Sequence, residues 1–192
     1  MKLSLFGYGG HAREVAAQMG KTVVFFVDDH LVDENTKPIS SFDPEQYEIM
    51  VAVADCKLRE IMVNKLPKET KYFTFIHPTA LIMDKNIKIG DGSFLGAHSI
   101  LTTNITLGRH TILNRGNQIG HDTILGDFCS LMPNSILSGN VVIGDRVYFG
   151  TNSSVREKIN ICNDVLIGMN GAVVKHITKS GKYVGVPAKL KK

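Results

Sequence analysis

Residues 89–173 place an apolar side chain at every sixth position, and this period restricts the fold more than any other feature of the chain. Fifteen consecutive positions obey it, although the chain is only 43% hydrophobic and chance would fill about six of them. A helix would repeat every 3.6 residues and a half-buried strand every two, so a period of six predicts a parallel β-helix. The fifteen residues are Ile89, Leu95, Leu101, Leu107, Leu113, Ile119, Leu125, Leu131, Leu137, Ile143, Phe149, Val155, Ile161, Ile167 and Val173.

Glycines recur at a fixed place in this repeat, directly after the apolar residue. A glycine at a repeated corner either adopts a positive φ or lies where a side chain has no room. Three hexads make a triangular coil of 18 residues, and coils stack at about 4.8 Å. The sequence therefore predicts five coils with glycine-marked corners. The glycines lie at positions 90, 96, 108, 120, 126, 144, 150 and 168.

A prism of this kind is narrow. It buries few side chains for each residue that folding orders, so burial inside one chain falls short of the entropy cost of ordering it. We therefore expect a flat outer face to be buried against a further copy of the chain, which predicts an oligomer.

The first 76 residues lack the period and alternate short apolar runs with helix-like segments. The order is strand, helix (His11–Met19), strand, strand, helix (Lys57–Lys65), strand, which predicts a small open α/β sheet, half of a doubly wound fold. We divide the chain into an α/β domain (1–76), a β-helix domain (77–178) and a C-terminal tail (179–192).

A glycine-rich turn follows the first predicted strand. Residues 7–12 read GYGGHA and fit the pattern GxGxxA, in which glycines let the backbone approach a phosphate at a helix N-terminus. Asp28 and Asp29 end the next strand, where an acid accepts hydrogen bonds from a ribose or base. The alternative is a glycine turn kept for packing. Half a dinucleotide fold favours a mononucleotide or nucleotide sugar, so an NAD-dependent enzyme is the weakest option.

Residues 18 apart stack in columns on a coil. His121 follows the inward Ile119, and Gly139 is one coil further in its column, so a bare backbone adjoins the imidazole. Asn114 begins another column that contains Gly150 and Gly168. A histidine beside glycine-lined slots suits a base that works next to a thin ligand such as a pantetheine arm.

Histidine is the natural base for taking a proton from an amine or hydroxyl near neutral pH, and Asp122 could orient its other ring nitrogen. The alternative is that His121 and Asp122 are polar turn residues on an exposed corner. We interpret His98 and His110 as surface turns. Cys129 is interpreted as a packing residue.

Composition excludes several classes of protein. Net charge is +4, and the three cysteines include no CxxC pair, which argues against a disulfide framework or a cysteine-rich zinc site. No apolar run approaches the ~20 residues of a membrane span, and no signal-peptide pattern follows Met1. We expect a cytoplasmic protein with no metal, no nucleic-acid partner and no membrane anchor.

The motifs in order closely resemble the NeuD-like sugar acetyltransferases. They are GYGGHAREVA, VDD, IHPTA, LNRGNQIGHD, GNVVIGD and VGVPAK, and they span nearly the whole chain. Within that family the chain is most similar to enzymes that acylate a nucleotide-linked 4-amino-4,6-dideoxyhexose. The resemblance implies a left-handed coil, a homotrimer with sites between neighbours, and transfer from acetyl-CoA to a sugar amine.

The resemblance also implies roles for individual residues. His121 is the general base and Asp122 its partner. The nucleotide sugar is bound by Gly7, Gly9, Gly10, His11, Asp28, Asp29 and Asn114. Acetyl-CoA lies along Gly139, Gly150, Thr151 and Gly168.

Two positions depart from the family pattern. Ser130 stands where many relatives carry a second histidine, and Arg115 follows Asn114 where His or Thr is usual. Two other functions stay open from the sequence. One is O-acetylation of a sugar such as sialic acid, and the other is a non-catalytic module that binds a nucleotide sugar.

Overall fold

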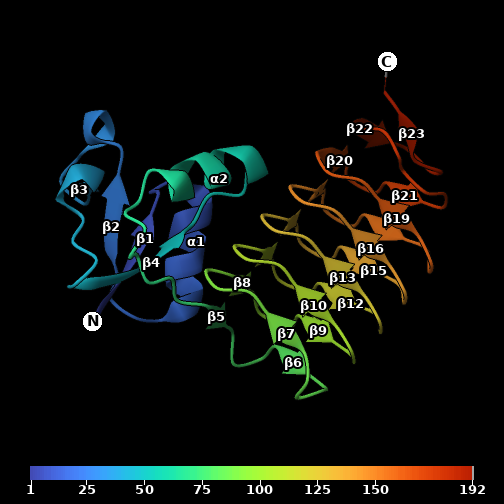
Figure 1. Cartoon of the computed structure of the whole chain (residues 1–192), viewed down its shortest axis with the longest axis horizontal. Coiled ribbons are helices and arrows are strands. Elements are labelled where there is room, and N and C mark those ends of the chain that lie inside the picture. Colours follow the sequence, from blue (N-terminus) through green and yellow to red (C-terminus); the bar gives the residue numbers. More distant parts are fainter. Residues whose placement is uncertain (192) are drawn as a thin grey trace.

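The computed structural model describes residues 1–191; Lys192, the last residue of the predicted tail, lies outside the described residues. The chain begins with a parallel four-stranded sheet in the order β3-β2-β1-β4 (Figure 1). The predicted half of a doubly wound fold is confirmed. The strands are β1 (Lys2–Phe6), β2 (Val24–Val27), β3 (Lys37–Pro38) and β4 (Tyr47–Val51).

Two helices accompany this sheet, each within one residue of its predicted ends. Helix α1 (Gly10–Met19) stops at Gly20, which adopts a left-handed φ of 60°. Helix α2 (Cys56–Asn64) begins at Asp55, whose carboxylate accepts a hydrogen bond from the Leu58 N–H at 2.8 Å. Two short 3₁₀ helices, η1 (Asp29–Leu31) and η2 (Ile39–Ser41), lie between β2 and β4.

The repeat forms a left-handed parallel β-helix, as expected (Figure 1). Its strands join three sheets, one on each side of the prism: an eight-stranded, a six-stranded and a five-stranded sheet. Strands β5 and β6 precede the first hexad of the sequence pattern, so the coil begins earlier than Ile89. The coil strands are β5 (Phe75–Ile76), β6 (Leu81–Ile82), β7 (Lys88–Ile89), β8 (Phe94–Leu95), β9 (Ile100–Leu101), β10 (Thr106–Leu107), β11 (Ile112–Leu113), β12 (Gln118–Ile119), β13 (Ile124–Leu125), β14 (Ser130–Leu131), β15 (Ile136–Leu137), β16 (Val142–Ile143), β17 (Tyr148–Phe149), β18 (Ser154–Val155), β19 (Asn160–Ile161), β20 (Val165–Ile167) and β21 (Ala172–Val173).

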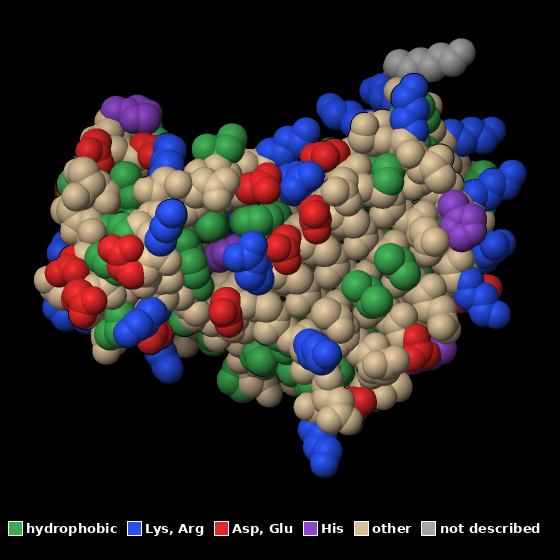
Figure 2. Space-filling view, viewed as in Figure 1, with side chains coloured by type: hydrophobic (Ala, Val, Ile, Leu, Met, Phe, Trp, Pro, Cys, Tyr) green, Lys and Arg blue, Asp and Glu red, His purple; other side chains and the backbone are tan. Residues whose placement is uncertain are grey.

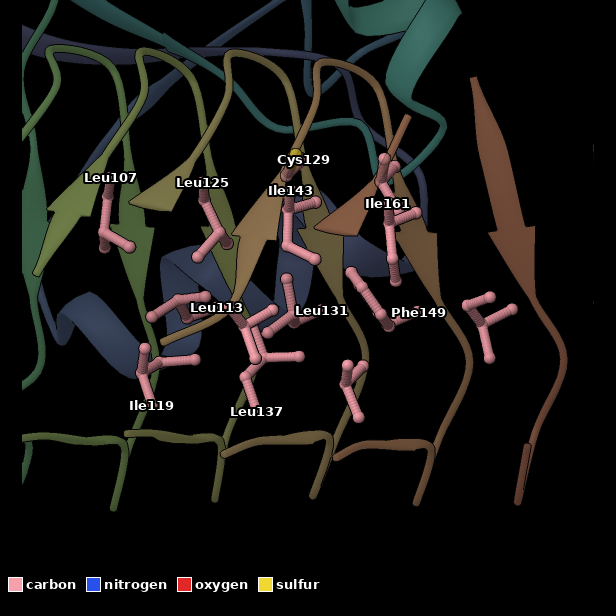
Figure 3. Packing of buried hydrophobic residues seen from close by; sticks show 14 of the residues in the cluster. Leu107, Leu113, Ile119, Leu125, Cys129, Leu131, Leu137, Ile143, Phe149 and Ile161 are labelled. Carbon is pink, nitrogen blue, oxygen red and sulfur yellow. The ribbon is translucent and has the colours of Figure 1, made fainter. Parts of the chain in front are cut away.

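The apolar residues of the hexads fill the interior of the prism (Figure 3). Fourteen of the fifteen are buried, and Ile89 is partly buried near the open end of the coil. Above the last coil, β22 (Gly181–Val184) pairs with β20 and β23 (Lys189–Leu190) pairs with β22. Lys and Arg side chains gather at this C-terminal end (Figure 2).

The backbone geometry at the corners explains why glycine recurs in the hexads. Left-handed φ values occur at every sixth residue from Gly92 to Asn170, three positions after the inward side chain and not at the repeated glycines. The repeated glycines lie instead where coils approach closely. A Cβ on Gly150 would lie 2.6 Å from the backbone nitrogen of Met169 in the next coil. Lack of room is therefore the reason for these glycines.

The N-terminal half packs on the outer face of the eight-stranded sheet. Ala12 and Val15 of α1 share a buried cluster with Phe94 and Ile112, which point outward from β8 and β11. The first 70 residues cover this face, whereas the six-stranded and five-stranded sheets carry exposed apolar side chains. These are Leu81, Ile124, Ile136 and Val142.

Arg59 of α2 forms hydrogen bonds that connect the α/β half to the coil. It is fully buried, and its guanidinium donates hydrogen bonds to the carbonyls of Val53, His110, Phe128 and Cys129 at 2.5–3.0 Å. Desolvation lowers the pKa of Arg59, and no carboxylate among residues 1–191 hydrogen-bonds to it. Three of these carbonyls belong to coil corners, and the guanidinium supplies the donor that these buried acceptors require.

We expect Arg59→Leu to lower the free energy of unfolding by about 3–5 kcal/mol, because several buried carbonyls lose their donor at once. Denaturant unfolding followed by circular dichroism measures the effect. Lys57→Ala is the matched control on the same helix: Lys57 is exposed and pairs with Asp164 at the surface, so its loss costs less than about 1 kcal/mol. Equal losses for the two variants would contradict this function of Arg59.

The interpretation of His110 as a surface turn is wrong. Its side chain is only 1% exposed, stacks on Phe128 and packs perpendicular to Tyr72, because α2 and the segment after it cover this corner. Desolvation, helped by Arg59 and Arg109, lowers the pKa of His110 to about 4. His98 is exposed, as predicted. No helix among residues 1–191 has the length and apolar character needed to cross a bilayer.

Candidate active site

His121 and Asp122 form a hydrogen-bonded pair at a corner of the prism. They lie in the connection from β12 to β13, and Nδ1 of His121 is 2.7 Å from Oδ2 of Asp122. Asp122 has a φ of 58° and also accepts a hydrogen bond from Asn104 Nδ2. The hydrogen bonds from Asn104 and His121 lower the pKa of Asp122, so the carboxylate is ionised near neutral pH. A carboxylate on Nδ1 fixes its proton there and leaves the lone pair on Nε2.

Gly139 lies directly against the imidazole. A Cβ on this residue would lie 2.5 Å from Nε2 and 2.6 Å from Cε1 of His121. The next N–H, that of Asn140, donates to the His121 carbonyl at 2.8 Å. The predicted column is therefore present, with the ring of His121 over the bare backbone of Gly139.

Asn114 lies at a different corner of the same chain. It belongs to the connection from β11 to β12, whereas His121 follows β12, so the six-stranded sheet separates the two corners. Gly150, Thr151 and Gly168 share the corner of Asn114 in higher coils. One chain therefore places the proposed base on one edge of the prism and most of the proposed acetyl-CoA residues on another.

The glycine turn lies at the carboxyl ends of β1 and β4. Gly7 has a φ of 116°, and a Cβ there would contact Val53 at 3.2 Å. Gly9 and Gly10 face open space, and Gly9 caps α1 without a side-chain hydrogen bond. No acidic residue occupies the first turn of α1. The free N–H groups of this helix end suit an anion such as a phosphate.

The two acids at the end of β2 already have partners in the chain. Asp28 pairs with Lys65 at 2.7 Å, and Asp29 accepts a hydrogen bond from the Ser40 N–H at 3.1 Å. That bond is the main cause of the lowered pKa of Asp29. Both lie at the same edge of the sheet as the glycine turn, but the Asp29 carboxylate is already bonded to η2.

His11 lies inside the contact between α1 and the coil. Its ring meets the face of Phe94 at 6.0 Å between centroids, and its Nε2 is buried with no hydrogen-bond partner among the described residues. Desolvation, helped by the charge of Arg59, lowers the pKa of His11 to about 4. His11 is therefore neutral at physiological pH and gives the glycine turn no positive charge.

Two contacts tie the glycine-turn region to the coil. Ser130, at the position where many relatives have histidine, donates its hydroxyl hydrogen bond to the Ala54 carbonyl at 2.8 Å. Arg115 forms an ion pair with Glu14 of α1. Sequence reasoning noted Arg115 as a departure and missed Glu14, because the pair joins residues 101 positions apart.

A cavity of about 650 Å³ opens between the start of α2 and the upper coils. Its charged side chains largely satisfy one another, since Arg146 pairs with Asp164 and Glu60, and Lys57 pairs with Asp164. No group of three or more metal-ligating side chains occurs within residues 1–191.

Comparisons with known proteins show which families and enzymes the chain resembles. The PglD N-terminal domain matches residues 2–66, and the bacterial transferase hexapeptide (six repeats) matches residues 122–157. Perosamine N-acetyltransferase from Caulobacter crescentus, solved with CoA and GDP-perosamine, has a TM-score of 0.90 at 29% identity and covers 100% of this chain and 98% of its own. The chain belongs to the hexapeptide-repeat sugar acetyltransferases.

Two curated proteins are also similar in sequence to this sugar acetyltransferase. GDP-perosamine N-acetyltransferase of Escherichia coli O157:H7 is 24% identical over 81% of the chain and 78% of the relative. A probable mitochondrial UDP-3-O-acylglucosamine N-acyltransferase of Arabidopsis thaliana is 34% identical over 64 residues, which are 33% of this chain and only 21% of that protein. The predicted family and the acyltransferase class are confirmed.

Two more structures of the Caulobacter enzyme carry a single replaced histidine. Asparagine replaces it in one and alanine in the other, and both hold CoA and GDP-perosamine. They show that a histidine of that enzyme can be changed with both ligands still bound.

Proposed function

We propose that this sugar acetyltransferase transfers the acetyl group of acetyl-CoA to the 4-amino group of a nucleotide-linked 4-amino-4,6-dideoxyhexose. The observation that carries the proposal is the His121–Asp122 pair, with Nε2 free over Gly139, in a fold shared with perosamine N-acetyltransferases. No feature of the site favours a hydroxyl acceptor over an amine. The proposed location is the cytoplasm.

His121 acts as the general base. The amine nitrogen attacks the thioester carbonyl carbon, and Nε2 of His121 takes the proton that the nitrogen loses. The Asp122 carboxylate then stabilises the imidazolium. Collapse of the tetrahedral intermediate breaks the carbon–sulfur bond, and the proton passes to the leaving thiolate of CoA. Backbone N–H groups next to the site stabilise the oxyanion.

The acceptor and acetyl-CoA occupy separate surfaces in this proposal. The nucleotide lies at Gly7, Gly9 and Gly10, where the end of α1 attracts its phosphates. Acetyl-CoA lies along the corner with Gly150, Thr151 and Gly168, and its thioester meets His121 beside Gly139. Gly150 is already needed for coil stacking, and a Cβ on Gly168 would meet Val184 of β22 at 2.9 Å, so both are weaker support for the acetyl-CoA path than Gly139 is.

A homotrimer completes the site. Asn114 and His121 lie on different corners of one prism, so a cleft that contains both requires a neighbouring copy. The exposed apolar residues on the two uncovered sheets flank the His121 corner, and a neighbour would bury them.

Mixed trimers test this arrangement. We expect His121→Ala and Asn114→Ala chains to be weakly active alone and to regain activity when co-expressed, because some interfaces then pair an intact His121 with an intact Asn114 of the neighbour. Random mixing gives about one such interface in four. The measurement is turnover of co-expressed chains against a blend of the two separately purified proteins. No gain on co-expression would contradict a site shared between copies.

The reaction is tested by the release of CoA thiol. The acceptors are GDP-, dTDP- and UDP-linked 4-amino-4,6-dideoxyhexoses, with free sialic acid as the hydroxyl control. We expect one nucleotide-linked amine to be acetylated far faster than the rest, with mass spectrometry locating the acetyl group on nitrogen. Faster acetylation of sialic acid would overturn the proposal in favour of O-acetylation. Nucleotide binding without thiol release from any acceptor would favour a non-catalytic module.

A further inference from the structure

Among the described residues, the one arginine that α1 places beside the glycine turn already uses part of its guanidinium on the turn itself. Arg13, the basic residue nearest to it on α1, donates from Nη1 to the Tyr8 carbonyl at 2.8 Å and lies 5.5 Å above the Tyr8 ring. His11 is neutral, and Lys65 is paired with Asp28. A nucleoside diphosphate carries at least two negative charges, which the end of a helix alone compensates only in part.

Arg115 approaches the turn from the coil. Its backbone N–H donates to Oδ1 of the buried Asn114 at 2.8 Å, and the following Gly116 N–H donates to Ala97 at 2.8 Å, so the corner is fixed. Ala97 in turn donates its N–H to Gln18 of α1 at 2.9 Å. The Arg115 side chain is 55% exposed and extends from this fixed corner to α1.

Glu14 holds the guanidinium of Arg115 close to the start of the helix. Side chains on a helix point back toward its N-terminus, so the carboxylate of Glu14 lies over the turn that contains Gly10 and His11. The 4.0 Å distance between Glu14 Oε2 and His11 Nδ1 agrees with this direction. About one helical turn, ~5.4 Å along the axis, therefore separates Glu14 from the start of the helix, where the phosphate is proposed to bind.

We propose that Arg115 is the phosphate-binding residue that sets the preference of the site for a nucleoside diphosphate. Glu14 holds its guanidinium in the empty site, and the diphosphate takes the place of Glu14 when the acceptor binds. A phosphate accepts two parallel hydrogen bonds from arginine and bears more charge than one carboxylate, so the exchange is favourable. This inference rests on the proposed function, because it requires a nucleotide-linked acceptor.

A purely structural function for the ion pair makes different predictions. If Arg115 and Glu14 only brace α1 against the coil, removal of either one has the same effect on nucleotide affinity and on thermal stability. If Glu14 competes with the phosphate, removal of Arg115 weakens binding and removal of the Glu14 charge strengthens it. The two variants therefore change affinity in opposite directions only under the proposal.

The test is calorimetric titration of GDP, dTDP and UDP, without any sugar amine, into the full-length protein. For the nucleotide that binds best, we expect Arg115→Ala to weaken binding about 10- to 100-fold and Arg115→Lys to weaken it less. Glu14→Gln is expected to tighten binding by a few-fold. The affinity of Arg115→Ala should also depend less steeply on salt. Its KM for acetyl-CoA should not change.

Arg109→Ala is the matched control. Arg109 is also an exposed coil arginine, and its pairing with Asp127 at 3.2 Å does not involve α1. We expect normal affinity for this variant. Wild-type binding that survives Arg115→Ala, or equal weakening by Arg115→Ala and Glu14→Gln, would overturn the inference and leave the proposed function standing. Failure of all three nucleotides to bind the wild-type protein would overturn both.

Discussion

His121→Ala is expected to lower kcat by about 10²- to 10⁴-fold, the range that general-base catalysis contributes. The loss should fall on kcat, because the amine loses the group that accepts its proton, while the glycine turn and most of the residues proposed to bind acetyl-CoA lie at other corners of the chain. The fold should be unaffected, since the His121 side chain is 56% exposed. Thiol release at saturating substrates measures kcat, and thermal unfolding measures the fold.

Two further measurements separate a base from a binding residue. Imidazole added to His121→Ala should restore part of the rate, because truncation leaves space for a small base beside Gly139. Asp122→Asn keeps a residue that tolerates the left-handed φ of 58° but removes the charge on Nδ1, and a smaller fall in kcat is expected. Near-normal turnover of His121→Ala would end its assignment as the base.

The repeat could be predicted in detail because one physical requirement recurs in every coil. Each inward position needs an apolar side chain, so the burial of Leu95 and of the later residues in its series can be predicted from the sequence alone. The first coil strands come before the unbroken series: β6 lies inside the predicted β-helix domain, whereas β5 lies at the end of the predicted α/β domain and pairs with the coil. Glycine was placed correctly, but its reason, close approach of coils, needed the distances at Gly150.

The contacts between the α/β half and the coil follow no repeating pattern in the sequence. His110 occupies a hexad position equivalent to that of the exposed His98, yet it is buried because α2 and the segment after it cover its corner. The burial of Arg59 likewise depends on where α2 meets the coil. A single sequence shows the repeat of apolar residues within an element. It does not show which face of that element is covered by another.

The place of Gly139 in its hexad gave a signal that sequence reasoning used only in part. Fifteen residues occupy the second position after the inward side chain, and Gly139 is the one glycine among them. Since this position accepts His121, Glu157 and other large side chains in neighbouring coils, stacking does not require a glycine here. The requirement comes from the imidazole that lies over it, and the column that contains both residues can be counted from the sequence.

Gly139→Ala is therefore expected to remove at least about 100-fold of activity without unfolding the protein. Its Cβ would overlap Nε2 and Cε1 of His121, so the ring must turn away and lose the 2.7 Å hydrogen bond to Asp122. Misplacing a catalytic group by about 1 Å can cost 10²-fold. The backbone does not resist the change, because no left-handed φ occurs at Gly139 and the overlapping atoms belong to an exposed side chain.

Two comparisons decide whether this loss acts through His121. In a His121→Ala background, Gly139→Ala should cost almost nothing more, because the group that it displaces is already gone. Gly150→Ala provides the structural contrast: its Cβ would meet the backbone of Met169, so it should lower thermal stability where Gly139→Ala does not. If Gly139→Ala destabilised the coil as much as Gly150→Ala, or if its effect simply added to that of His121→Ala, the glycine would be serving the coil and not the base.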